Sequence, residues 1–333
     1  MTFLKKICLL LVSVSLYADT NHFSLIVVGG GIAAHTAAIY GGNARIETAM
    51  LVGPRPGGQL AIAGMVENMP GVEAQFGMSI IERLEKQAVD FGATSIYATV
   101  SSISVQETTG EEQKPRFTLH TAEGIDYYAD ALVIATGSRP RTLGIPGESE
   151  FWGSGVSTCA VCDCSFAQDK DIVIVGGGDA AIEEALQLAS YAKNITLLLR
   201  SKTFRASARM QEKLSRFSHI SYRYDVEVQE IFGDGSSMTG VKIYNKVTDE
   251  YEIINAQGLF LAIGQLPETA FIKDLVHCDA LGYITLTDRQ KTSVEGIFAA
   301  GDVTDNRYRQ AIVASGDAAK AALDAIAYLR GID

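Results

Sequence analysis

The chain has 333 residues, of which 47% are hydrophobic and 20% are charged, and its formal net charge is −11 at pH 7. This composition is typical of a folded globular protein with room for two domains and argues against intrinsic disorder. The acidic balance argues against nucleic acid as the main partner, and five cysteines are too few for a disulfide-stapled secreted scaffold.

The chain starts with MTFLKKICLLLVSVSLYADT, which has the layout of a secretory signal peptide. Two lysines precede an apolar run, Ile7 to Leu16, that is short for a membrane span, and Ala18 offers a small residue at a cleavage point. Leu16 is larger than the residue usual three positions before such a cut. A start site placed too early is the alternative, so residues 1–22 are treated as a leader or an extension.

Two glycine-rich stretches, SLIVVGGGIAAHTAAIY at 24–40 and KDIVIVGGGDAAIEEALQLA at 170–189, share one layout. Each predicts a strand, a tight turn and a helix, and each matches the pattern G-x-G-x-x-A. In this pattern the first glycine permits the turn, the second admits a pyrophosphate, and the small third residue lets helix and strand pack closely. The matching positions are Gly29, Gly31 and Ala34, then Gly176, Gly178 and Ala181.

One such match is weak evidence, because ordinary glycine-rich turns also fit the pattern. Two matches in one chain, each between a predicted strand and a predicted helix, imply two bound dinucleotides. Electron transfer between the two dinucleotides is then the leading interpretation.

We call the two G-x-G-x-x-A matches the first and second fingerprints. The strand after the second fingerprint, NITLLLR, is followed by Arg200, Lys202 and Arg205 and by no acidic residue. An NAD site usually has Asp or Glu at this point, whereas guanidinium groups bind a 2′-phosphate. This loop therefore indicates NADPH, with a solvated basic turn as the alternative. The corresponding strand of the first unit ends in Val52 and Gly53 and carries neither signal.

The segment 129–147 predicts a strand, the triplet Ala135-Thr136-Gly137 and a proline-rich link out of the first unit. The stretch 258–269 has the same role for the second unit, and 294–325 predicts a further strand, a Gly-Asp loop and an alanine-rich helix. We therefore expect an α/β protein with two Rossmann-like, three-layer ββα domains, the first of them discontinuous.

The stretch STCAVCDCSF, residues 157–166, contains Cys159 and Cys162 as a C-x-x-C pair. Such a pair closes a disulfide or exposes a reactive thiolate. Zinc would need two more ligands, and neither Cys278 nor the five histidines has suitable spacing. A purely structural disulfide would leave two nucleotide sites without a substrate.

The chain resembles the low-molecular-weight thioredoxin reductases, which are dimeric and use FAD and NADPH. The resemblance runs from about residue 24 to the C-terminus. It rests on GGGIAAHTAAIY, GGQL (57–60), VENMPG (66–71), ATG (135–137), CAVCD (159–163), GGGDAAIEEA (176–185), FRA (204–206), AAGDV (299–303) and YRQA (308–311).

The resemblance implies that electrons pass from NADPH to FAD, then to the Cys159–Cys162 disulfide and on to thioredoxin. Cys162 lies against the flavin, Cys159 attacks the substrate disulfide, and Asp163 is the general acid and base. It assigns FAD binding to Gly29, Gly31, Ala34, Val52, Gly53, Gly57, Gly58, Gln59, Asn68, Thr136, Gly137, Gly301, Asp302, Arg309, Gln310 and Ala311. It assigns NADPH binding to Gly176, Gly178, Ala181, Arg200, Lys202 and Arg205.

The implied organisation is an FAD domain at 23–138 and 267–333, with an NADPH domain at 142–266 between them. The family rotates the second domain about linkers, here near 138–144 and 264–270, so that the disulfide and the nicotinamide reach the flavin in turn. A homodimer in the cytoplasm, where FAD and NADPH are supplied, is expected, with export or tethering through the leader as the alternative. No metal is expected.

Two departures from the family pattern bear on function. Cys164 follows Asp163 where the family usually has glycine, and is either a tolerated small residue or a third redox thiol. The usual HRR is Leu199-Arg200-Ser201, so the NADPH loop lacks one cation and a histidine. A flavin-dependent dithiol oxidase and a nucleotide-binding redox sensor without turnover stay open as alternatives to thioredoxin reduction.

Overall fold

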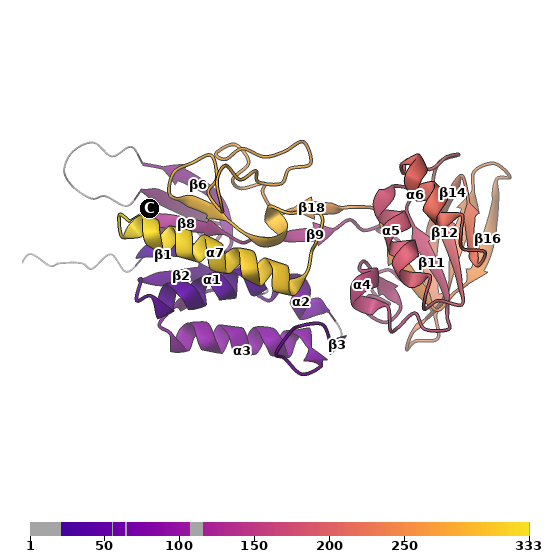
Figure 1. The fold of residues 1–333 in the computed structure, drawn as a ribbon, viewed down its shortest axis with the longest axis horizontal. Helices are drawn as coiled ribbons and strands as arrows, with labels where there is room; N and C mark the ends of the chain where they lie inside the picture. The colour runs from indigo at the N-terminus through magenta and orange to yellow at the C-terminus, as the bar shows by residue number, and fades with distance from the viewer. Residues whose placement is uncertain (1–20, 55, 64, 107–115, 333) are drawn as a thin grey trace, which may run out of the picture.

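The computed structural model describes residues 21–54, 56–63, 65–106 and 116–332. Figure 1 shows two lobes joined by a narrow waist that the chain crosses twice. The first lobe combines residues 21–137 with 268–332, and the second lobe holds residues 141–264. Apart from its last two residues, the expected leader lies outside the described residues. Over the described ranges, no helix combines the length and the apolar character that crossing a membrane requires.

The sheet of the first lobe follows the order β5-β2-β1-β8-β7-β6, and β19 joins it by pairing with β8. The strands are β1 (His22–Val28), β2 (Thr48–Leu51), β5 (Thr94–Ile96), β6 (Val100–Val105), β7 (Phe117–Thr121), β8 (Asp126–Ile134) and β19 (Ile297–Ala299). The first half of β8 pairs antiparallel with β7, and its second half pairs parallel with β19. The C-terminal segment thus returns to the first sheet, which confirms that this unit is discontinuous.

Helices cover one face of this sheet: α1 (Ile32–Asn43), α3 (Gly77–Asp90) and α7 (Ala311–Leu329). Alternation along β1 explains the two faces, because Leu25 and Val27 point to the helices while Ile26 and Val28 join the opposite core. Alanines form most of the contact between α1 and α7, so the two helices approach closely. The remaining elements near the site are α2 (Gly58–Ile62), β3 (Met65–Val66), β4 (Gln75–Phe76) and the 3-10 helix η1 (Gly301–Val303).

The second lobe has three layers. Its middle layer is a parallel sheet in the order β10-β17-β11-β12-β13, namely Val156–Ser157, Gly258–Leu261, Asp171–Val175, Asn194–Leu198 and Ile220–Arg223. On one face lie the helices α4 (Ala160–Asp163), α5 (Asp179–Leu188) and α6 (Ala208–Leu214), and on the other lies the antiparallel sheet of β14 (Val226–Gly233), β15 (Met238–Asn245) and β16 (Glu250–Asn255). Ile172 and Ile174 face the helices, whereas Val173 faces the antiparallel sheet.

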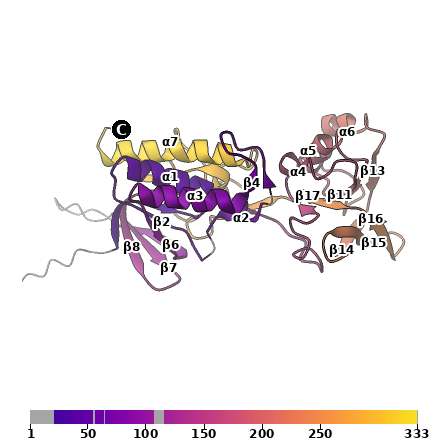
Figure 2. The ribbon, with the colours of Figure 1, turned by 90° about the horizontal axis from the view of Figure 1, so that it is seen from below.

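The waist, which Figure 2 shows from a second direction, contains a two-stranded ribbon whose strands are labelled in Figure 1. In it β9 (Ser138–Pro140) pairs antiparallel with β18 (Gln265–Pro267). A salt bridge of 2.7 Å between Arg139 Nε and Glu268 Oε1 closes one end of the ribbon, and the Arg141 N–H donates to the Gly264 carbonyl at 3.0 Å at the other. Both predicted linkers therefore lie side by side. The expected class, an α/β protein with two Rossmann-like units, is confirmed.

Candidate active site

The first glycine turn forms a cradle that fits the pyrophosphate of a dinucleotide. Gly29 has φ +136°, and a Cβ there would lie 2.3 Å from the Ala135 carbonyl oxygen. Gly31 precedes α1 without a side-chain cap, and a Cβ there would meet no atom closer than 3.9 Å. Ala34 is fully buried beneath the turn. The first turn of α1 therefore presents its N–H groups to an open cradle.

A cavity of about 650 Å³ opens in front of this cradle. Fourteen of the sixteen residues assigned to FAD line it: Gly29, Gly31, Val52, Gly53, Gly57, Gly58, Gln59, Asn68, Thr136, Gly137, Asp302, Arg309, Gln310 and Ala311. Ala34 and Gly301 do not line it; they are buried behind it, where Gly301 packs against α1 and α7. Thr99, Glu268 and Phe271 also line the cavity, and no motif in the sequence singles them out.

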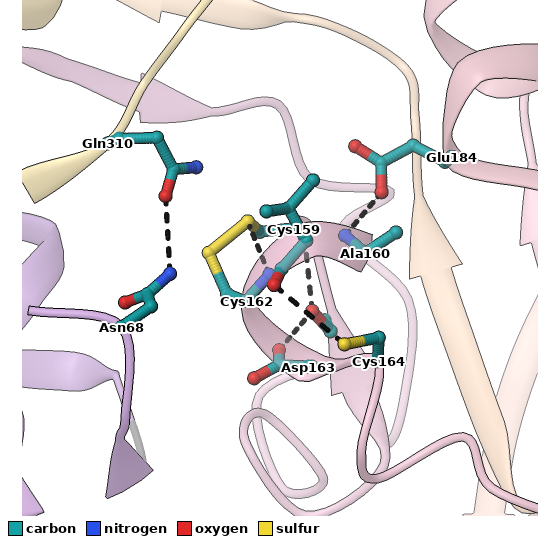
Figure 3. The surroundings of a disulfide bond; sticks show 10 residues. Asn68, Cys159, Ala160, Cys162, Asp163, Cys164, Glu184 and Gln310 are labelled. Carbon is teal, nitrogen blue, oxygen red and sulfur yellow. Dashed lines mark hydrogen bonds between the residues drawn. A yellow bond between two sulfur atoms is a disulfide. The ribbon is translucent and has the colours of Figure 1, made fainter. Parts of the chain in front are cut away.

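Charged groups in this cavity are arranged for a polar ligand. Burial raises the pKa of Asp302 to about 6, although the nearby positive charge of Arg309 opposes the shift. Within the described part of the chain, the buried Nε of Arg309 has no hydrogen-bond partner. Asn68 Nδ2 donates to Gln310 Oε1 at 3.3 Å, across the cavity from the cysteines (Figure 3). An unpaired buried donor is costly unless a ligand accepts from it, so the site fits the polar groups of a flavin dinucleotide.

The Asp302→Asn variant is expected to stabilise the cofactor-free protein at alkaline pH. A carboxyl whose pKa rises from 3.8 to about 6 on folding opposes folding wherever it is ionised. This penalty to the free energy of folding is absent below pH 3.8, the pKa of the unfolded carboxyl. It grows as pH rises toward about 6, the pKa in the folded protein, and is fully present above that. Between pH 4.5 and 8 the penalty should grow by about 2 kcal/mol. Urea unfolding of wild type and Asp302→Asn at the two pH values measures this change. If the two proteins differ in unfolding free energy by the same amount at both pH values, Asp302 does not have the raised pKa.

The two cysteines of the C-x-x-C pair form a disulfide at the edge of the same cavity (Figure 3). Cys162 and Asp163 line the cavity of the first fingerprint. Cys159 lines an adjoining hollow of about 570 Å³, together with Cys162, Tyr308 and Arg309. Cys162 thus lines both cavities, whereas Cys159 lines only the neighbouring one.

Hydrogen bonds hold the turn that carries the disulfide. Ser157 Oγ donates to Asp163 Oδ2 at 2.5 Å and accepts from the Cys159 N–H at 3.1 Å. Burial raises the pKa of Asp163, and the Ser157 hydrogen bond partly offsets it. On α5, Glu184 accepts from the Ala160 N–H, which ties the cysteine turn to the second fingerprint helix. Ser157 and Glu184 were not predicted, because their contacts depend on folding rather than on spacing.

The second glycine turn repeats the first. Gly176 has φ +151°, and a Cβ there would lie 2.8 Å from the Cβ of buried Ala181, while Gly178 precedes α5 and faces open space. A cavity of about 810 Å³ beside this turn is lined by Gly176, Arg200 and Arg205. Gly178, Ala181 and the exposed Lys202 do not line it, whereas Arg139 and Arg141 of the waist do. The residues assigned to NADPH are therefore brought together only in part.

The disulfide belongs to the first cavity and not to the second. In the described ranges, Arg139 is the one residue that lines both. Those ranges also hold no cluster of three or more His, Cys, Asp or Glu residues suited to a metal ion. Through Cys162 the disulfide therefore lines the first cavity, whereas neither cysteine lines the second.

The family model for pyridine nucleotide-disulphide oxidoreductases matches residues 23–318. A thioredoxin reductase of Dictyostelium discoideum is 40% identical over 319 residues, covering 92% of this chain and 98% of that protein. The chain belongs to the thioredoxin reductase family. The resemblance drawn from the motifs is confirmed, and a flavin and a pyridine nucleotide are implied by the family.

Solved structures of family members share the fold. The thioredoxin reductase from Giardia duodenalis has a TM-score of 0.86 at 41% identity, covering 93% of this chain and 99% of that chain. A Lactococcus lactis thioredoxin reductase in the FR conformation covers the same shares at 32% identity, but with a TM-score of 0.62. In the thioredoxin reductase described here, the extra cysteine, Cys164, is a half-buried free thiol that also lines the first cavity.

Proposed function

We propose that the chain is a thioredoxin-disulfide reductase that holds FAD in the first lobe and takes electrons from NADPH bound to the second. The observation that carries this proposal is the position of the Cys159–Cys162 disulfide, at the mouth of the first fingerprint's cavity. The second fingerprint has a cavity of its own with Arg200 and Arg205 in its wall, which favours a coenzyme with a 2′-phosphate. The partner is thioredoxin or a thioredoxin-like protein.

When bound, the nicotinamide and the flavin supply the electron pair that opens the disulfide. The chain contributes the cradles and the charges that hold these groups. Gly29 and Gly31 would admit one pyrophosphate, Asp302 and Arg309 would offer an acceptor and a donor in the same cavity, and Gly176 and Gly178 repeat the first cradle in the second lobe.

The opened pair has two distinct thiols. The Cys162 N–H donates to Cys159 Sγ at 3.2 Å, and a hydrogen bond of this kind favours the thiolate form of Cys159. This thiolate attacks one sulfur of the partner disulfide, and the other partner sulfur leaves and takes a proton. Cys162 then attacks the Cys159 sulfur of the mixed disulfide, which restores the Cys159–Cys162 bond and releases the partner as a dithiol.

Asp163→Asn is expected to lower kcat for thioredoxin reduction by roughly a hundredfold, the usual effect of losing a general acid or base. Burial raises the pKa of Asp163, so the carboxyl keeps a proton to a higher pH than an exposed aspartate does. The amide is nearly the same size and still accepts from Ser157, so flavin content should not change. Steady-state kinetics and flavin absorbance measure the two effects. An unchanged kcat would exclude the acid-base role.

The two lobes must change their relative position for both sites to serve one flavin. We propose rotation about the ribbon of β9 and β18, with hinges near 138–144 and 264–270. The different TM-scores of the Giardia and Lactococcus structures, at equal coverage, support more than one arrangement of lobes within the family. We place the domains at 23–138 with 267–333, and at 142–266. A cytoplasmic homodimer is part of this proposal.

The experiment that tests the function follows NADPH oxidation by the purified flavoprotein with and without thioredoxin. We expect steady oxidation that depends on thioredoxin, with little peroxide. Peroxide formation from an added dithiol would favour the alternative, a flavin-dependent dithiol oxidase. Tight NADPH binding without turnover in either assay would favour a redox sensor.

A further inference from the structure

The cavity of the second fingerprint contains a cation that comes from the waist rather than from the coenzyme-binding loop. We propose that Arg141 binds the pyrophosphate of the nicotinamide dinucleotide and thereby joins the bound coenzyme to the hinge. This inference rests on the proposed function, since it assumes that the second cavity takes such a coenzyme.

Backbone contacts place Arg141 next to the glycine turn. The Arg141 N–H donates to the Gly264 carbonyl at 3.0 Å, and a Cβ on Gly264 would lie 3.6 Å from Arg141 Cδ, so the arginine stem runs along Gly264. Ala262, two residues earlier, donates its N–H to the Val175 carbonyl at 2.9 Å. The Ala262 carbonyl oxygen would lie 2.5 Å from a Cβ on Gly176. Arg141 and the first glycine of the turn thus flank the same short segment.

Arg200 lies where a dinucleotide site holds a different part of the coenzyme. Arg200 follows β12, the strand after the fingerprint, where dinucleotide sites hold the ribose 2′ position. The pyrophosphate instead lies at the glycine turn and the N-terminus of the following helix. The position of Arg141 near Gly176 therefore suits the pyrophosphate, whereas Arg200 suits the 2′-phosphate.

The charges around the cavity leave Arg141 available. Arg139 forms a salt bridge with Glu268, and Glu227, the acidic residue in the cavity wall, forms one with Lys246 at 2.5 Å. Across the described residues, no ion pair involves Arg141, and its side chain is exposed. A guanidinium free of carboxylates beside a phosphate cradle is suited to bidentate binding of phosphate.

The location of Arg141 couples coenzyme binding to the hinge between the lobes. It directly follows β9 in the ribbon about which the lobes are proposed to rotate. A contact between its guanidinium and the coenzyme makes one hinge strand part of the coenzyme site. Hinge position and coenzyme affinity are then linked, because each biases the other.

Equilibrium binding tests this inference without relying on turnover. Titration calorimetry on the flavin-loaded protein would compare NADP+ and NAD+ binding to wild type, Arg141→Ala and Arg200→Ala, with the exposed Arg216→Ala as a neutral control. Arg141→Ala should raise both dissociation constants by a similar factor, about tenfold, because both coenzymes carry the pyrophosphate. Arg200→Ala should raise the constant for NADP+ alone.

Three outcomes would overturn the inference. If wild type binds NADP+ and Arg141→Ala binds both coenzymes as wild type does, Arg141 does not contact the coenzyme. If only NADP+ weakens, Arg141 contacts the 2′-phosphate and not the pyrophosphate. If wild type binds neither coenzyme, the proposed function fails, and the inference fails with it.

Discussion

Cys159→Ser and Cys162→Ser are each expected to abolish thioredoxin reduction while the protein keeps its flavin. Neither side chain belongs to a hydrophobic core, because the pair lies in a short turn at the mouth of a cavity, and Cys162 is exposed. Each sulfur is needed for a different bond in the exchange, so removing either stops turnover rather than slowing it. Thioredoxin-dependent NADPH oxidation and the visible flavin spectrum measure the two properties.

Cys164→Gly is the matched control for these variants. It removes a thiol two residues from Cys162 and restores the residue usual in the family, so activity should stay close to that of wild type. Loss of activity in Cys164→Gly would assign this free thiol a catalytic role. Activity above a few per cent of wild type in either serine variant would contradict the dithiol mechanism.

Arg200→Ala and Arg205→Ala are expected to raise the Michaelis constant for NADPH by roughly ten- to a hundredfold each, because a charge-assisted contact to phosphate contributes about 1.5–3 kcal/mol. Both arginines line the second cavity at the end of β12, and no acidic residue follows that strand. NADH has no 2′-phosphate, so its kinetics should hardly change. Initial rates with both coenzymes give the comparison.

Ser201→Arg extends the same experiment. Ser201 lines the cavity beside Arg200, so an arginine there would restore the missing cation and should tighten NADPH binding. If the alanine variants weaken both coenzymes equally, the arginines support the loop rather than bind the phosphate. If wild type already prefers NADH, the assignment of this loop is wrong.

Local sequence patterns predicted the two Rossmann-like units because their central strands are buried on both faces and their turns need glycine. The run before Gly29 forms β1, the run before Gly176 forms β11, and a side chain at either glycine would clash with backbone. The return of the chain to the first sheet was also predictable, since residues 294–325 repeat the strand-then-helix pattern. The shared strand β8, which pairs with both β7 and β19, was not, because pairing partners depend on tertiary contacts.

The site was predictable where a motif carries it and not where contacts cross between elements. The glycine turns were found from their spacing, whereas the redox role of the Cys159–Cys162 pair came from its spacing together with the family resemblance. The contact of Glu184 with Ala160 joins residues 24 positions apart, and Arg141 reaches the second cavity only because β9 pairs with β18. Conversely, Lys202 follows the same strand as Arg200, yet its position in the loop leaves it outside the cavity wall.

Thiol labelling after anaerobic treatment with NADPH tests the central claim most directly. The flavin-loaded protein would be mixed with NADPH, quenched with an alkylating agent, denatured and mapped by mass spectrometry, beside a sample without NADPH. We predict that Cys159 and Cys162 are alkylated only after NADPH treatment, while Cys164 and Cys278 are alkylated in both samples. An intact Cys159–Cys162 disulfide after NADPH has reduced the flavin would contradict the account.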